Sequence, residues 1–181
     1  MSILVAITGA SGVIYGVRLL EVLKDKNIKT YCVISKSAEK ILRHEIGDFD
    51  LKIPHYREDE ITAPFSSGSF KLNAMAVVPC SMKTLAAMAH GYASNLITRS
   101  ADVMLKEKKK LIIVPRETPL NAIHLENMLK LANMGAIILP AMPAFYHKPE
   151  KIEDLVDFIV GKILDSLGVE NELYKRWGHE E

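Results

Sequence analysis

The sequence has no strong excess of charge and no long apolar run. Its 23 Lys and Arg residues against 22 Asp and Glu residues leave a formal net charge of +1, so no global field points to nucleic acid or to an anionic membrane. The opening run SILVAITGA is too short to span a bilayer and lacks the basic stretch of a signal peptide. We therefore expect neither a nucleic-acid partner nor a membrane partner.

Cysteines and metal-binding patterns are also scarce. Cys32 and Cys80 are the only cysteines, without CxxC spacing or a secreted framework, so we expect a reducing compartment and a cytoplasmic protein. The sequence has no HExxH motif and no cluster of His, Cys and Asp residues, and it predicts no metal site. Cys80 has no adjacent base, so we interpret it as a small buried apolar residue, and His124 as a residue on a helix surface.

Apolar segments alternate with helical patterns along the chain. The expected strands are 2–8, 29–35, 74–80, 110–116 and 136–140, and the expected helices are 13–26, 36–46, 81–90, 95–109, 118–135 and 152–167. Strands that are apolar on both faces and separated by helices indicate a parallel sheet covered on two sides. We expect one doubly wound α/β domain in three α/β/α layers over 1–168, followed by a C-terminal tail, 169–181.

Two segments carry more specific expectations. Thr118 and Pro119 predict the cap and the first residue of the fifth helix. The buried face expected for that helix consists of Leu125, Met128, Leu129 and Ala132. Residues 47–73 form a long, strand-poor connection, and such loops are commonly lids, partner-binding segments or disordered.

The stretch ITGASGVIYG (7–16) joins the first expected strand to the first expected helix. A glycine loop in this place offers free backbone N–H groups and the positive end of a helix dipole, which suit a phosphate. The glycines do not follow the G-x-G-x-x-G pattern, and Ser35, not an acidic residue, ends the second strand. The sequence therefore favours FMN over NAD. For Ser11 one alternative stays open, namely that it only caps the helix.

A second polar helix start, PCSMKT (79–84), follows the third expected strand. Ser81 and Thr84 supply hydroxyl groups there. Because the carboxyl ends of parallel strands meet at one edge of a sheet, Ser11, Ser35 and Ser81 are expected to lie along the same edge. Flavodoxin-like folds hold a mononucleotide at such an edge without an acidic residue that reads the ribose.

The segment VPRETP (114–119) places Arg116 and Glu117 where a buried strand ends. One interpretation is a surface ion pair of little energetic value. The other is that Arg116 holds an anionic ligand while Glu117 moves a proton, since a partly desolvated carboxylate can be tuned for acid–base catalysis.

Long segments of the chain resemble the flavin prenyltransferase family of the UbiX type. These segments are TGASGVIYG, ISKSA, PCSMKTLAAMAHGYASNLITRSADVMLKE, VPRETPLNAIHLENMLKLANMGAIILPAMPAFYHKP and RWG. The resemblance covers nearly the whole chain and implies a Rossmann-like, flavodoxin-related fold that binds FMN. It implies a metal-free transfer of a dimethylallyl group from dimethylallyl monophosphate to N5 and C6 of reduced FMN. The product, prenylated FMN, would serve UbiD-type decarboxylases, and the implied assembly is a homododecamer with sites between subunits.

The resemblance also implies site residues. Contacts to FMN fall on Gly9, Ala10, Ser11, Ser35, Ser81, Met82, Lys83, Thr84 and Arg116. Contacts to the prenyl phosphate fall on Tyr146 and Lys162, with Arg99 and Lys106 also near that phosphate and Trp177 near the site. Catalytic roles fall on Glu117, Ser11, Glu45 and Lys106. Lys162 stands where some relatives carry arginine, which keeps the charge but loses the bidentate fork.

Two alternative functions stay open on the residues alone. One is an FMN-dependent decarboxylase of the same fold, although four groups around a phosphate exceed what a carboxylate substrate needs. The other is a non-catalytic FMN carrier, in which Glu45 and Glu117 would be superfluous.

Aromatic residues outside the expected core predict a homo-oligomer. Phe65 and Phe70 lie in the 47–73 connection and Trp177 lies in the tail. Large apolar groups have little reason to face solvent on a monomer, and aromatic residues are enriched in interface cores. We expect a prenyl site shared across an interface.

Overall fold

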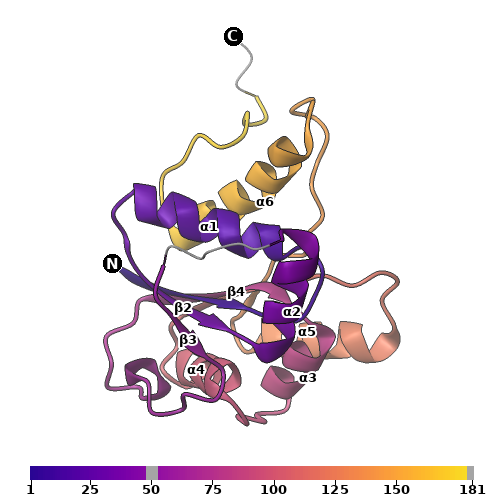
Figure 1. The fold of residues 1–181 in the computed structure, drawn as a ribbon. Coiled ribbons are helices and arrows are strands. Elements are labelled where there is room, and N and C mark those ends of the chain that lie inside the picture. The colour runs from indigo at the N-terminus through magenta and orange to yellow at the C-terminus, as the bar shows by residue number, and fades with distance from the viewer. Residues whose placement is uncertain (48–52, 179–181) are drawn as a thin grey trace.

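A single parallel sheet organises the computed structural model, which describes residues 1–47 and 53–178 (Figure 1). Its strands are β1 (Ser2–Ile7), β2 (Lys29–Ile34), β3 (His55–Arg57), β4 (Ala74–Cys80), β5 (Lys110–Pro115) and β6 (Ile137–Ile138). They run in the order β3-β2-β1-β4-β5-β6, and every pairing is parallel. The order reverses between β1 and β4, which is the point where ligands bind in doubly wound sheets.

Helices cover both faces of the sheet. One face carries α1 (Val13–Asp25), α2 (Lys36–Glu45) and α6 (Ile152–Leu167), and the other carries α3 (Met82–Ala89), α4 (Leu96–Lys106) and α5 (Ala122–Asn133). Figure 1 shows α1 and α6 above the sheet and α3 and α4 below it. The predicted three-layer α/β fold is confirmed.

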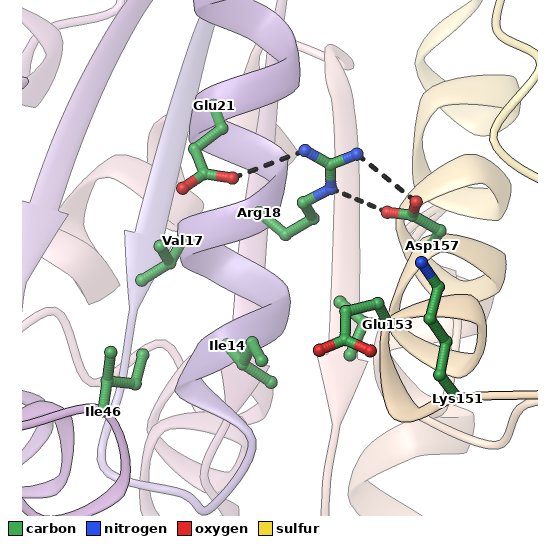
Figure 2. Close-up of a pocket in the computed structure, with 9 residues that line it drawn as sticks. Ile14, Val17, Arg18, Glu21, Ile46, Lys151, Glu153 and Asp157 are labelled. Atoms are coloured by element: carbon green, nitrogen blue, oxygen red, sulfur yellow. Dashed lines mark hydrogen bonds and ion pairs between the residues drawn. The ribbon is translucent and has the colours of Figure 1, made fainter.

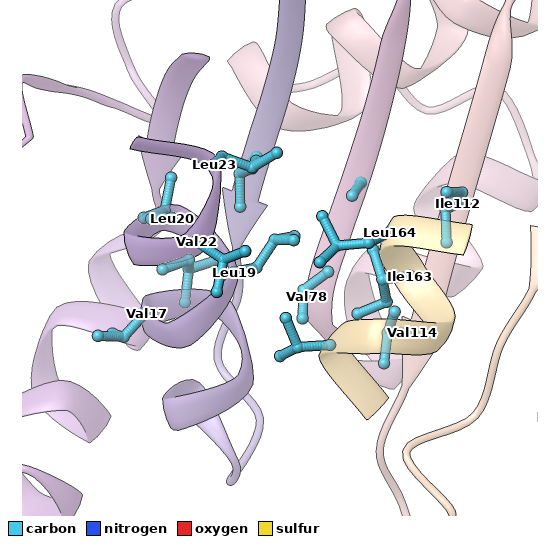
Figure 3. Close-up of a cluster of buried hydrophobic side chains, with 14 of the residues drawn as sticks. Val17, Leu19, Leu20, Val22, Leu23, Val78, Ile112, Val114, Ile163 and Leu164 are labelled. Carbon is cyan, nitrogen blue, oxygen red and sulfur yellow. The ribbon is translucent and has the colours of Figure 1, made fainter. Parts of the chain in front are cut away.

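The core is divided into two clusters by the sheet. Alternate residues of β1 enter different clusters: Val5 and Ile7 pack toward α1 and α6, whereas Leu4 and Ala6 pack toward α3 and α4. Figure 3 shows the first cluster, where α1 and α6 pack over the central strands. Because the central strands β1 and β4 are buried on both faces, the sheet is stable only between two helical layers.

The 47–73 connection is more ordered than expected over its described part. It contains β3 and a short 3-10 helix (Pro64–Ser66), while 48–52 lie outside the described residues. Phe65 is 1% exposed and packs edge-on against Tyr56, with a centroid separation of 5.0 Å. Phe70 is half-buried against Tyr31 at 5.5 Å. The prediction that these two phenylalanines are exposed for an interface was therefore wrong, because they anchor the connection to its own chain.

The start of α5 also differs from the prediction. The helix begins at Ala122, after a cis peptide bond between Thr118 and Pro119. Its cap is Asn121, whose side chain accepts a hydrogen bond from the backbone N–H of His124, while the His124 ring accepts one from the Asn121 N–H. This capping box, and not Thr118, begins the helix, because it satisfies N–H groups that a helix start leaves without a partner. His124 is thus a helix residue with a structural role.

The expected buried face of α5 is also largely wrong. Of its four residues only Met128 is buried; Leu125 and Leu129 are 53% and 62% exposed, and Ala132 is exposed. The helix covers the edge of the sheet, where β6 has only two residues, so little lies beneath the rest of its apolar surface. Among the described residues, no helix is long and apolar enough to cross a membrane.

Candidate active site

The carboxyl ends of β1 and β4 are joined by a buried threonine. Thr8 is fully buried; its hydroxyl donates to the carbonyl of Pro79 at 2.8 Å and accepts from the backbone N–H of Ser81 at 2.8 Å. These bonds hold the glycine loop and the start of α3 together at the point where the strand order reverses. Thr8 was not among the predicted site residues, although its place at the end of an apolar strand was a usable signal.

The glycine loop needs its glycines for two different reasons. A Cβ at Gly9 would lie 2.5 Å from the Cβ of Ser37, so only glycine allows α2 to approach the loop. Gly12 has φ of +92°, in the left-handed region that favours glycine. Ala10 is buried and Ser11 is exposed. The loop is therefore shaped by close packing, and it presents Ser11 outward.

Glu45 caps the helix that Ser11 was expected to cap under the alternative interpretation. The Oε2 atom of Glu45 accepts hydrogen bonds from the N–H groups of Gly12 at 2.9 Å and Val13 at 3.3 Å. The cap residue of α1 is Gly12, so the interpretation of Ser11 as a simple cap is wrong. A carboxylate at a helix N-terminus is stabilised by the helix dipole, and this contact places Glu45 at the glycine loop.

Ser35 and Ser81 cap the two neighbouring helices on the same edge. The Oγ of Ser35 accepts from the N–H of Ala38 at 3.1 Å, and the Oγ of Ser81 accepts from the N–H of Thr84 at 3.3 Å. The Ser81 hydroxyl also donates to the Thr84 Oγ1 at 3.1 Å. The next residues of α3, Met82 and Lys83, lie in a first turn whose N–H groups have no partner within the helix.

Arg116 carries an orphaned polar atom at this edge. Its Nε is buried and has no hydrogen-bond partner among the described residues, and a buried unpaired donor of this kind costs about 1–3 kcal/mol. Glu117 is exposed and accepts from the N–H of Thr118 at 3.1 Å. The interpretation of Arg116 and Glu117 as a surface ion pair is not supported. The arrangement suits a ligand acceptor atom beside Arg116.

A small pocket of about 100 Å³ adjoins Arg116 and Glu117, and Leu120, Met128 and Met142 supply apolar wall. A larger pocket of about 440 Å³ lies between α1 and α6 (Figure 2). None of the predicted site residues lines it. Its Arg18 is neutralised by Asp157 at 2.7 Å, so we place the site at the carboxyl edge.

The four groups expected around a prenyl phosphate are not brought together by one chain. Arg99 donates to the carbonyl of Ser66 and to Asp102, each at 3.1 Å, and Lys106 donates to Glu107 at 3.0 Å, all on the α4 side of the sheet. Tyr146 and Lys162 lie on the opposite, α6 side.

Trp177 lies on the α6 side with Tyr146. The two rings meet edge-on at 5.4 Å, and Trp177 is 80% exposed. Figure 1 shows the chain before and after α6 extending away from the sheet. Tyr146 is 40% exposed, so both rings lie on the surface of the single chain.

The two cysteines have no reactive surroundings. Cys32 and Cys80 are fully buried and unpaired. Burial raises the pKa of Cys32 to about 12 and raises that of Cys80 as well. The interpretation of Cys80 as a buried apolar residue is confirmed. The described residues include no group of three or more His, Cys, Asp or Glu side chains placed to hold a metal.

Comparison with known proteins decides the family. A family model described as Flavoprotein matches residues 1–164. The flavin prenyltransferase UbiX of Methanocaldococcus jannaschii is 55% identical, with 98% of this chain and 99% of the relative covered. The chain belongs to the UbiX-type flavin prenyltransferase family. The mitochondrial flavin prenyltransferase PAD1 of Saccharomyces cerevisiae is 48% identical over 97% of the chain and 74% of the relative.

Two solved UbiX structures share this fold over nearly the whole chain. AnUbiX (PadA1) in complex with FMN and dimethylallyl pyrophosphate has a TM-score of 0.95 and 45% identity, covering 99% of this chain and 98% of that one. A dodecameric FMN-dependent UbiX-like decarboxylase from Escherichia coli O157:H7 has a TM-score of 0.93 and 44% identity, covering 98% and 99%. The family resemblance deduced from the sequence motifs is confirmed.

Proposed function

We propose that this chain transfers a dimethylallyl group from dimethylallyl monophosphate to N5 and C6 of reduced FMN. The observation that carries the proposal is the buried, unpartnered Nε of Arg116 beside helix starts that bear hydroxyl groups. The family membership and the relative solved with FMN and dimethylallyl pyrophosphate support it.

The carboxyl edge fits a flavin nucleotide. The edge comprises the glycine loop 8–12, Ser35, 81–84, Arg116 and Glu117. Arg116 and the first turn of α3 offer donors to anionic or carbonyl oxygens. The small pocket lined by Leu120 and Met128 offers apolar wall to a ring system. Reduced flavin supplies the electron-rich nucleophile, so no covalent serine or cysteine is needed.

The leaving phosphate needs cations that a single chain does not assemble. Departure of an allylic phosphate creates an anion, and each preorganised donor aimed at it is worth about 3 kcal/mol. Arg99 and Lys106 lie on the α4 face, whereas Tyr146 and Lys162 lie on the α6 side. We therefore place the complete prenyl site between subunits, where Trp177 can stabilise cationic character on the prenyl group.

Exposed apolar side chains support that assembly. Ile123 and Leu129 on α5 are 64% and 62% exposed, Met142 is 71% exposed and Phe145 is 69% exposed. An assembly that covers such large apolar side chains removes them from water. A homo-oligomer, with the dodecamer of the E. coli relative as its model, covers this surface and unites the two sets of phosphate ligands.

Two carboxylates are available for the proton that leaves C6. Glu117 is exposed at the carboxyl edge, while Glu45 is bound to the glycine loop beside Ser11. We assign Glu117 the role of base, with Ser11 and Glu45 as a relay. Since Glu45 already accepts two N–H bonds, its placement is set before a ligand binds.

The direct test is incubation with reduced FMN and dimethylallyl monophosphate, followed by mass analysis of the extracted flavin. A flavin heavier by one prenyl group supports the proposal. An FMN-dependent decarboxylase or an FMN carrier would return FMN of unchanged mass. Repeating the reaction with dimethylallyl pyrophosphate establishes which donor is preferred.

The proposed function also implies which enzymes use the product and in which compartment the protein works. Prenylated FMN would pass to a UbiD-type decarboxylase, and adding such an apo-decarboxylase to the reaction should produce decarboxylation activity. Two buried, unpaired cysteines fit a cytoplasmic, reducing environment.

A further inference from the structure

The segment after α6 is bound to that helix by one carboxylate. Asp165 accepts hydrogen bonds from Tyr174 at 2.7 Å, from Asn171 at 2.9 Å and from Arg176 at 2.7 and 3.1 Å. Three side chains of the 169–178 segment thus converge on a single residue of α6. Such a segment would otherwise be expected to fray, as chain termini do.

The hydrogen bonds to Asp165 require an ionised carboxylate at Asp165 and a protonated hydroxyl at Tyr174, and both are present at neutral pH. Burial raises the pKa of Asp165, but the hydrogen bonds from Arg176 and Tyr174 outweigh burial and hold that pKa below its ordinary value of 3.8. Burial and then the bond to Asp165 raise the pKa of Tyr174 to about 12. Asp165 is therefore a charged acceptor, and Tyr174 keeps the proton that it donates.

Close packing against α6 reinforces these bonds. A Cβ at Gly161 would lie 2.5 Å from a ring carbon of Tyr174 and 3.0 Å from the side-chain oxygen of Asn171. Asn171 is 8% exposed and donates to the carbonyl of Gly161 at 3.3 Å. The absence of a side chain at Gly161 therefore allows the 169–178 segment to pack directly against α6.

A chain of aromatic contacts runs from this attachment to the outer surface. Tyr174 meets Phe158 at a centroid separation of 5.0 Å, Phe158 meets Tyr146 at 5.9 Å, and Tyr146 meets Trp177 at 5.4 Å. Trp177 follows Arg176 directly, and it is 80% exposed. Its ring position therefore depends on the attachment of Tyr174 and Arg176 to Asp165 and on the contact with Tyr146.

We infer that Asp165 is a positioning residue that holds Trp177 against Tyr146 and so orients both rings toward the prenyl donor. The inference rests on the proposed function, since Tyr146 and Trp177 are assigned there to the prenyl site. Asp165 touches no substrate in this arrangement; it acts through Tyr174 and Arg176. An exposed indole on an unattached segment would sample many orientations, and small displacements of a positioning group cost on the order of a hundredfold in rate.

The test uses the full-length protein and the fluorescence of Trp177, which is the only tryptophan in the chain. Asp165→Asn removes the charge that binds Arg176. Gly161→Ala displaces Tyr174 without changing any charge, and it favours the helix itself. Asp157→Asn is the matched control, because Asp157 is an ion-paired carboxylate on the same helix that binds Arg18 and not the 169–178 segment.

We expect Asp165→Asn and Gly161→Ala to lower the fluorescence anisotropy of Trp177 and to increase its quenching by acrylamide. In both variants kcat/KM for dimethylallyl monophosphate should fall roughly ten- to a hundredfold, while FMN affinity stays within about twofold of wild type. In a Trp177→Ala background, Asp165→Asn should add little further loss. Asp157→Asn should leave the Trp177 signal and the kinetics unchanged.

Unchanged Trp177 anisotropy in both variants would overturn the inference. So would a loss of FMN affinity and melting temperature that parallels the loss of turnover, since that pattern indicates a general structural role. Failure of the proposed function is recognised separately, because wild-type protein would then yield no prenylated flavin. The anisotropy measurements would in that case still decide whether Asp165 places Trp177.

Discussion

The carboxyl edge and the α6 side of this molecule are built in opposite ways. At the carboxyl edge, Thr8, Glu45 and Ser81 form hydrogen bonds within the chain and hold the glycine loop before any ligand binds. On the α6 side, Tyr146 and Trp177 stand exposed. The first region is held by hydrogen bonds within one chain, whereas the second presents exposed aromatic rings. Flavin binding and prenyl-donor binding should therefore be separable by mutation.

The largest expected effect is on chemistry at the carboxyl edge. Glu117→Gln should retain FMN binding and lower turnover by about 10²–10⁴, the usual loss for a general acid–base group. Titration with FMN and mass analysis of the flavin product measure the two quantities. Glu126→Gln, an exposed carboxylate on α5, is the control and should behave as wild type. Near-normal output of prenylated flavin from Glu117→Gln would refute the assigned role.

The second-largest loss of turnover is expected from removing part of the α6 side. Deleting residues 172–181 should lower turnover roughly a hundredfold, since it removes Trp177 and the ring that packs on Phe158. The fold should persist because α6 already ends at Leu167 and Gly168 caps it. Circular dichroism, light scattering and a turnover assay report fold, assembly and activity. A truncated protein with full turnover would contradict the proposed division of the site.

Single substitutions on the α6 side should affect the two ligands unequally. Lys162→Ala and Tyr146→Phe should each raise KM for the prenyl donor about tenfold, the loss expected for a hydrogen bond to a charged group. FMN affinity should not change, because neither residue lies at the carboxyl edge. Lys24→Ala, at the exposed end of α1, provides the control. A large loss of FMN affinity with an unchanged KM would reverse the assignment.

The smallest effect on turnover is expected from the shape of the glycine loop, where the loss falls on stability and FMN affinity. Gly9→Ala places a Cβ 2.5 Å from Ser37, and relieving such a clash costs about 1–3 kcal/mol. Melting temperature should fall and FMN should bind more weakly, while the Trp177 fluorescence stays as in wild type. Gly47→Ala is the comparison, because its φ of +86° strains an alanine while the added Cβ meets nothing within 4 Å, so this variant lowers stability without crowding the glycine loop. Equal FMN affinity in the two variants would show that the loop tolerates movement.

Most of the sheet and its helices followed from local patterns. The strands β1, β2, β4 and β5 matched the apolar runs to within one residue, and α6 matched its prediction at both ends. These elements are determined by residues close in sequence, since a strand that is apolar on both faces and a helix ended by glycine are local signals. The motifs shared with flavin prenyltransferases could likewise be recognised from the sequence, because they are long and occur in the family's order along the chain.

The tertiary structure decided what depends on residues far apart. Glu45 caps a helix 33 residues earlier in the chain, so Ser11 is left free. Phe65 is buried by rings from β2 and β3, and the sequence around it looks like an exposed loop. Asp165 binds a segment that composition alone marks as a polar tail. Local propensity and periodicity carry no information on such contacts, because their energy arises only after the sheet has brought the partners together.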